Sequence, residues 1–367
     1  MKKSILAILL ALVMVASLLP FGALADVDTI VAEPTPTGSG NYFFANGVPI
    51  TITDSKPSDG TVATVSGFTA TGDSAYISWT VNGATSYVGV PQNAWVFGGA
   101  DGRNDRVTVA STSINMTGGT IDRLFGGNYG EEGSGDFCSE VTGNVSIALS
   151  GNAVVRELLH GAGARNTCVK GTVYMTFNGV NLSKSNTDFV YINGGSWGNG
   201  YEGARNIENG TMDTDAVANN VVIRGEGSKF ALIGVGPSGS AKVVKGSLSL
   251  TDCEVGNLYF GAINGETVES SITLNRCTVD TFCSTNRGFV GNAEANIYNT
   301  KISTFRTGAA NGCFTTDSGT PDGSGVTGSV TYNIDAESTV EDAALTPLVV
   351  RDTNDQTTAS IGNITLN

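Results

Sequence analysis

The only histidine of the chain, His160, stands among four charged residues. Arg156 and Glu157 precede it, and Arg165 and Lys170 follow it. A polysaccharide lyase needs a base beside an acidic sugar proton, and a glycoside hydrolase needs paired carboxylates. If the protein were an enzyme of either kind, this segment is where its catalytic groups would be sought.

The local pattern favours a structural role for His160 instead. It lies between an apolar pair and a glycine, and Phe125 and Ile192 take the same place in two other segments. We therefore interpret His160 as a corner residue and predict no assembled catalytic set. Catalysis by a lyase or hydrolase is the least favoured of three functions that we consider.

A second group of chemically capable residues lies in an insertion at residues 196–216. Trp197, Tyr201, Glu202 and Arg205 stand there among glycines and asparagines. Aromatic rings with amide and carboxylate neighbours could stack on sugar rings and hydrogen-bond their hydroxyls. Long loops on a regular scaffold often carry function, so this insertion is the predicted glycan-binding site.

The alternative for this insertion is an aromatic plug that folds the loop back onto the body of the protein. Trp95 and Tyr129 would extend the same face if the loops align. Carboxylates also gather in Gly-rich loops at 101–105, 213–215 and 317–322, but none fits an EF-hand. We expect these carboxylates to be structural and predict no metal and no cofactor.

The elements that must position these residues follow a repeat of 24 residues. The segment from Val244 to Leu258 matches the segment from Val268 to Phe282 at every apolar position, and a cysteine recurs in both. Apolar residues alternate with Ser and Thr, as in strands with one buried face. A repeat of this length built from short strands predicts a β-solenoid, whose units bury their apolar faces against each other.

The predicted core of the first unit consists of five residues: Val244, Leu248, Leu250, Val255 and Leu258. We place the solenoid at 98–367, with a degenerate unit near 295–297. Residues 41–97 alternate without a clear 24-residue match, so they are an N-terminal β cap, degenerate first coils or a small separate sandwich. Near the C-terminus, 338–345 could form a short helix or another strand, and 361–367 is strand-like.

One segment shows the repeat in its fullest form: Ile114-Asn-Met116-Thr-Gly118-Gly119-Thr-Ile121-Asp-Arg-Leu124-Phe125-Gly126-Gly127. This form resembles the adhesin-like right-handed parallel β-helix proteins that gut and anaerobic Gram-positive bacteria secrete. The resemblance covers about residues 95–335. It implies an all-β, single-stranded, right-handed parallel β-helix and a surface or extracellular role, with no defined ligand.

The first 25 residues are predicted to be a secretory signal peptide. Lys2 and Lys3 precede an apolar run, and small residues end it before Asp26. Residues 26–40 are Pro- and Gly-rich and read as an arm or linker. Removal of the leader takes the formal charge from −14 to −16. Such acidity argues against nucleic acid and anionic membranes as partners and suits a secreted, extracellular or cell-surface protein.

Export permits disulfide bonds, and the mature chain keeps all six cysteines. Cys253 and Cys277 occupy the same place in adjacent units, so we pair them. Cys138 and Cys168 both lie just before a predicted strand, so we pair these too, which leaves Cys283 with Cys313. The alternative is free buried thiols.

Three functions follow, in order of preference. The first is a non-enzymatic structural or adhesive protein, whose open solenoid ends could join end to end into fibres. The second is glycan binding through the 196–216 loop. The third is the lyase or hydrolase.

Overall fold

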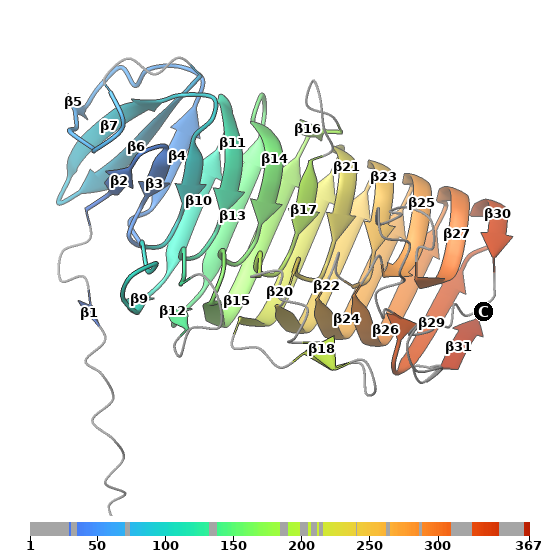
Figure 1. The fold of residues 1–367 in the computed structure, drawn as a ribbon. Helices are drawn as coiled ribbons and strands as arrows, with labels where there is room; N and C mark the ends of the chain where they lie inside the picture. The colour runs from blue at the N-terminus through green and yellow to red at the C-terminus, as the bar shows by residue number, and fades with distance from the viewer. Residues whose placement is uncertain are drawn as a thin grey trace, which may run out of the picture.

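The computed structural model describes residues 29–30, 35–69, 74–131, 138–183, 190–198, 205–206, 211–212, 216–239, 241–261, 265–285, 288–309, 325–344 and 363–367. The described part is all-β, and most of its strands belong to two long parallel sheets (Figure 1). Successive units of the chain give one strand to sheet A and then one to sheet B. The predicted signal peptide lies outside the described residues.

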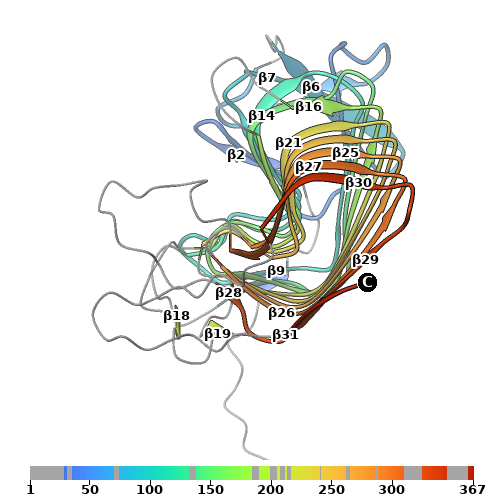
Figure 2. The ribbon, with the colours of Figure 1, turned by 90° about the vertical axis from the view of Figure 1, so that its right-hand side faces the viewer.

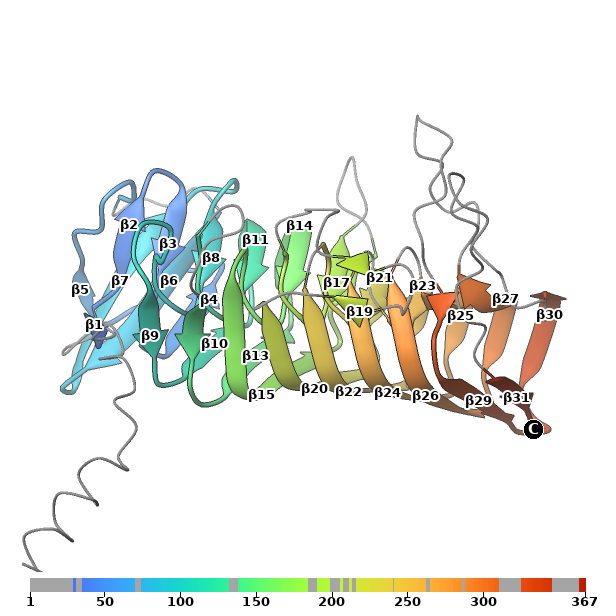
Figure 3. The ribbon, with the colours of Figure 1, turned by 60° about the horizontal axis from the view of Figure 1, so that its bottom comes forward.

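Sheet A runs along one side of the molecule (Figure 3). Its main strands are β4 (Ile50–Thr53), β10 (Thr112–Met116), β13 (Val145–Ser150), β15 (Thr167–Asn178), β20 (Val217–Glu226), β22 (Lys242–Thr251), β24 (Glu266–Asn275), β26 (Phe289–Tyr298), β29 (Ser329–Ile334) and β31 (Asn363–Leu366). Short strands pair beside them: β1 (Thr29–Ile30), β9 (Val107–Val109), β12 (Ser139–Val141) and β28 (Gly325–Val326). From β10 to β31 every neighbouring pair of main strands is parallel.

Sheet B packs against sheet A across the core. Its strands are β3 (Tyr42–Phe44), β8 (Trp95–Phe97), β11 (Thr120–Phe125), β14 (Val154–His160), β17 (Tyr191–Asn193), β21 (Lys229–Gly234), β23 (Glu254–Tyr259), β25 (Thr278–Thr285), β27 (Lys301–Ala309) and β30 (Thr339–Ala344), with β2 (Thr37–Ser39) and β16 (Asn181–Leu182) at its margins. Figure 2 looks along the row of strands and shows that the units nearly superimpose.

The 24-residue repeat is confirmed by the strand register. Leu248 pairs with Ile272 and Leu250 with Leu274 in sheet A, and Leu258 pairs with Phe282 in sheet B. All six side chains belong to one continuous core. Truncation of such a side chain to alanine costs about 2–5 kcal/mol, so these rows hold the units together.

The prediction that Val244 belongs to the core is wrong, because its side chain is 38% exposed. The valine before it, Val243, is buried, and its row continues through Ala218 and Val169. The register shifts between Val169 and Thr172, where β15 holds an extra residue relative to β20. Within β22 itself, two exposed residues, Val244 and Lys245, separate the buried Val243 and Gly246, so the alternation breaks there and Val244 faces outward.

The corner between the two sheets has a left-handed backbone in successive units. Gly151, Gly179 and Gly227 have φ near +60°, and Asp252 and Arg276 follow with φ of +54°. Glycine adopts this conformation at little cost, whereas other residues strain. In the two later units the bidentate ion pair between Arg276 and Asp252, at 2.8 Å for both contacts, spans the corner.

Antiparallel strands interrupt the parallel pattern at the N-terminal end. β6 (Ala75–Val81) pairs antiparallel with β4 and with β7 (Ala84–Val90), and β5 (Thr61–Val62) pairs with β7. β3 and β8 nevertheless continue sheet B in register with β11. The 41–97 segment therefore holds both the first strands of sheet B and an antiparallel cap. At the other end, β30 is a strand, as the second alternative for 338–345 predicted.

Candidate functional site

The outer face of sheet B carries a group of rings and guanidinium groups over its first strands. We call it the aromatic–arginine cluster: Tyr42, Trp95, Arg103, Arg123, Tyr129, Arg165 and Trp197. These side chains are half-buried, except Tyr129, which is buried. The strands of sheet B supply Tyr42, Trp95 and Arg123. The adjoining turns supply the others, where isolated bridges link Tyr129 to Ala164 and Ala164 to Trp197.

Arg123 lies at the centre of this cluster. Its guanidinium carbon is 3.8 Å from the ring centre of Trp95 and 5.4 Å from that of Trp197. Glu157 on the next strand accepts hydrogen bonds from Nε at 2.8 Å and from Nη2 at 2.6 Å. Cation–π contacts of this kind contribute about 0.5–2 kcal/mol each, so the cluster stabilises its own geometry.

Arg103 repeats the arrangement at the first turn. Asp101 accepts two hydrogen bonds from its guanidinium, at 2.8 and 2.6 Å. The guanidinium carbon lies 4.9 Å from the ring centre of Tyr42 and 5.1 Å from that of Tyr129. The hydrogen bonds that Arg103 donates to Asp101 raise the pKa of Arg103 above its ordinary value. The cluster thus presents fixed cations on a protein of strongly negative formal charge.

A stack of parallel rings lies beneath the cluster. Phe44, Phe97 and Phe125 follow each other at centroid distances of 5.1 and 4.6 Å, and His160 continues the row 5.7 Å beyond Phe125. His160 therefore takes the place of Phe125, as predicted. Its predicted equivalence with Ile192 is wrong, because His160 pairs with Asn193.

The imidazole of His160 is fully buried. Burial lowers its pKa to about 3, with a further contribution from Arg123, and Nδ1–H donates to the carbonyl of Gly195 at 3.3 Å. A ring that stays neutral and enclosed at ordinary pH is poorly suited to general acid–base chemistry. The charged residues around it in sequence have other partners: Arg156 pairs with Asp122, and Lys170 with Glu140.

The structure describes only some of the predicted glycan-binding residues. The ring centres of Trp197 and Trp95 are 6.2 Å apart, and the guanidinium carbon of Arg165 lies 5.0 Å from the ring centre of Trp197. This contact agrees with the alternative of a ring that packs back onto the body, while the ring keeps some exposure. Tyr201 and Glu202 lie outside the described residues. Arg205 begins the two-residue strand β18 (Arg205–Asn206), which pairs with β19 (Thr211–Met212), and its side chain is not described.

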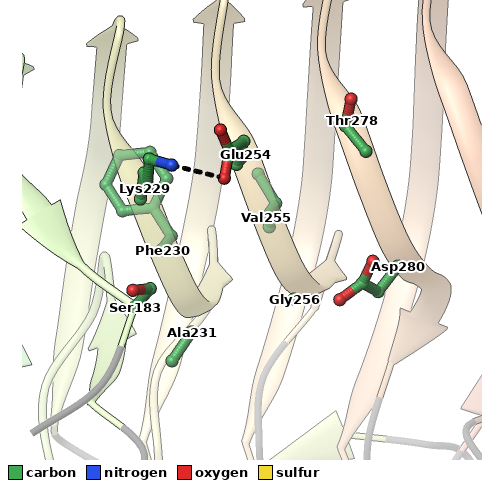
Figure 4. Close-up of a pocket in the computed structure, with 9 residues that line it drawn as sticks. All are labelled: Ser183, Lys229, Phe230, Ala231, Glu254, Val255, Gly256, Thr278 and Asp280. Atoms are coloured by element: carbon green, nitrogen blue, oxygen red, sulfur yellow. Dashed lines mark hydrogen bonds and ion pairs between the residues drawn. The ribbon is translucent and has the colours of Figure 1, made fainter.

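Sequence reasoning missed a second site on sheet B. A groove of about 360 Å³ lies over β21, β23 and β25 (Figure 4). Ser183, Lys229, Glu254, Thr278 and Asp280 supply its polar groups. Lys229 Nζ donates to Glu254 at 2.8 Å. The sequence held one signal for this groove. The third residue of both β21 and β23 is small, Ala231 and Gly256, and leaves space on the outer face of the sheet.

The structure places the two cysteines of one predicted pair near each other. Cys253 and Cys277 lie in adjacent units, and each thiol shifts the pKa of the other. The thiol of Cys253 lowers the pKa of Cys277 to about 7, while the contact raises the pKa of Cys253. In the structure both are thiols, so the disulfide stays a prediction.

The other pairs differ from expectation in detail. Cys138 precedes β12, but Cys168 lies inside β15, opposite Glu140 rather than Cys138. Their thiols still meet, and the hydrogen bond from Cys138 lowers the pKa of Cys168, helped by Lys170 and Arg106. Cys283 is buried beside Tyr259. Its predicted partner, Cys313, lies outside the described residues.

No group of three or more potential metal-binding side chains lies together among the described residues. Over the same ranges, no helix has the length and apolarity needed to span a membrane. Comparisons of the chain with protein-family models, with curated proteins and with solved structures found no match.

Proposed function

We propose that the chain is a secreted, right-handed, single-stranded parallel β-helix that acts as a non-enzymatic structural or adhesive protein outside the cell. One observation supports this most: the parallel pairing continues from β10 to β31 without an antiparallel break, with one register shift between β15 and β20. Such a row makes a stiff, extended body (Figure 1). A body of this shape can hold a binding surface away from an anchoring point.

Assembly into fibres would use the edge of sheet A that β31 forms. Among the described residues β31 pairs with β29 alone, and Leu366 is 48% exposed there. The N-terminal end carries the antiparallel β6–β7 hairpin, so a joint between two chains would differ from the parallel contacts between units within one chain. Electron microscopy of purified mature protein tests the idea. Rods longer than one chain are expected, and Leu366→Lys should shorten them; monomers alone at high concentration would contradict it.

Glycan binding by the aromatic–arginine cluster is the second candidate. Half-exposed rings of Tyr42, Trp95 and Trp197 stand beside Arg103 and Arg123, which could hydrogen-bond sugar hydroxyls or a uronate. The test is retention on immobilised polysaccharides. The double variant Trp95→Ala, Trp197→Ala should lose retention. The variant Tyr298→Ala removes an exposed ring from sheet A, 46% exposed, and should keep it. Equal retention of both variants would contradict the hypothesis.

Polysaccharide cleavage remains third. In the groove over β21, β23 and β25, Glu254 is held by Lys229, and Asp280 lies one strand further on. An assay for new reducing ends and for unsaturated products across acidic and neutral polysaccharides tests this hypothesis. The first two functions predict no product above a heat-treated control, and sustained turnover that Glu254→Gln abolishes would overturn them.

A further inference from the structure

The groove on sheet B is hollow because two consecutive units lack an outward side chain of any size. Ala231 and Gly256 form its floor, and a Cβ atom on Gly256 would lie 2.5 Å from the carbonyl oxygen of Ala231. Only glycine fits at that position without a shift of the backbone. The next unit places Asp280 there instead, so the hollow ends at a carboxylate (Figure 4).

Hydrogen-bonding groups surround this floor. The Ser183 hydroxyl lies toward β16 and Asp280 toward β25, with the ion pair of Lys229 and Glu254 and the hydroxyl of Thr278 along one side (Figure 4). The volume of about 360 Å³ falls at the lower end of the range of small-molecule sites, roughly 300–1,000 Å³. Its size suits one or two sugar rings.

The charges of the described lining residues do not cancel. Lys229 and Glu254 neutralise each other at 2.8 Å. Among the described residues, no ion pair involves the Asp280 carboxylate, so this described part of the lining carries one net negative charge. A ligand with hydroxyl groups and one cation would satisfy both the hydroxyls and this carboxylate through a charge-assisted hydrogen bond. A uronate would meet repulsion.

We propose that this groove is a carbohydrate-binding site that takes an amino sugar, with its ammonium group on Asp280 and its hydroxyls on Glu254, Lys229, Thr278 and Ser183. The site is separate from the aromatic–arginine cluster. It would serve an adhesive protein whose target polymer contains free amino groups.

Calorimetric titration of the mature protein with a glucosamine trimer tests the proposal. The N-acetylated trimer, which has the same ring and no ammonium group, is the comparison ligand. The wild-type protein should bind the glucosamine trimer at least about tenfold more tightly than the acetylated one, since a charge-assisted hydrogen bond contributes that much or more. Asp280→Asn should reduce the affinity by a similar factor.

A matched variant controls for loss of surface charge. Lys301 and Glu341 form the same kind of exposed pair, at 2.7 Å, on β27 and β30 outside the groove. Glu254→Gln should weaken binding of the glucosamine trimer, whereas Glu341→Gln and Trp95→Ala should leave it within about twofold. Absence of binding to wild-type protein, equal affinity for both trimers, or equal loss in Glu254→Gln and Glu341→Gln would each overturn the proposal. Loss confined to Trp95→Ala would assign the ligand to the aromatic–arginine cluster instead.

Discussion

The N-terminal and C-terminal halves of sheet B share the same parallel strand pairing, but their outward side chains differ in chemical type. In the N-terminal half one outward row reads Trp95, Arg123, Leu158 and Tyr191. In the C-terminal half the same row continues as Leu232, Asn257, Thr281 and Thr304. The inward row stays apolar throughout, from Val96 to Phe305. The inward side chains therefore set the architecture, and the outward ones are free to make a packed aromatic surface or an open polar groove.

The largest expected effect comes from removing a ring in the N-terminal half. Phe97 is fully buried and stacks with Phe44, Phe125 and Tyr129. Phe97→Ala should lower the free energy of unfolding in urea by about 3–5 kcal/mol. Thr281→Ala on the same face of the C-terminal half should change it by less than about 0.5 kcal/mol. Similar losses in both variants would mean that the two halves depend equally on their outer faces.

Oxidation of Cys253 and Cys277 should stabilise the C-terminal half, which lacks the ring stack. A disulfide between them closes a loop of one repeat and should add about 3 kcal/mol to the free energy of unfolding. Because the contact with Cys253 lowers the pKa of Cys277, Cys277 should supply the attacking thiolate when the pair is oxidised. Peptide mapping after mild oxidation should find this pair, and Cys277→Ser should remove the gain. A map without that peptide would contradict the predicted pairing.

The next largest effect is a pH dependence of the free energy of unfolding that arises in the N-terminal half of sheet B, because His160 belongs to the ring stack there. Its pKa is about 3 in the folded protein and about 6.5 in an unfolded chain. The unfolded state alone binds the proton between these values, so the contribution of the neutral ring is fully present above pH 6.5 and is lost as the pH falls toward 3.

His160→Phe should remove this dependence while keeping the stack. Over pH 6 to 4, the free energy of unfolding of the wild type should fall more steeply than that of the variant, by about 1.4 kcal/mol per pH unit. Urea denaturation at several pH values measures both slopes. Parallel slopes would show that the imidazole is protonated at no cost in the folded state.

The smallest expected effect concerns guanidinium pairs. Arg123→Ala should destabilise the protein by about 1–2 kcal/mol, since it removes the contact with Trp95 and leaves Glu157 without its partner. Arg276→Ala breaks the same bidentate geometry with Asp252 at an exposed corner and should have no resolvable effect. A larger loss for Arg276→Ala would show that the corner, rather than the aromatic cluster, stabilises the units.

The sequence predicted the core rows where the repeat is strict. Leu248, Leu250 and Leu258 recur at 24 residues because each must meet its counterpart in the next unit. The prediction was wrong at Val244, because two consecutive exposed residues, Val244 and Lys245, separate the buried Val243 and Gly246 in β22. A break of this kind in the alternation is not visible in the types of the residues, and only the pairing with neighbouring strands reveals it.

The sites were less predictable than the fold. Trp197 was identified from its type and its loop, but its contacts with Trp95 and Arg165 depend on strands and turns far apart in sequence. The groove over β21, β23 and β25 gave almost no sequence signal, because it arises where Gly256 lies beside Ala231 in the neighbouring unit. A hollow between small residues forms only where strand pairing brings those residues side by side, and the spacing of residues along the sequence does not determine this pairing.

Distances between labels on one outward row test the stacked register most directly. Ser146, Ser271 and Glu294 lie on the same exposed row of sheet A, reached through successive parallel pairings. Spin labels on non-natural amino acids, which leave the native cysteines intact, should give about 19 Å between 146 and 271 and about 24 Å between 146 and 294, at roughly 4.8 Å per strand. Two equal distances, or a shorter distance to 294 than to 271, would contradict the in-register stack on which both sites depend.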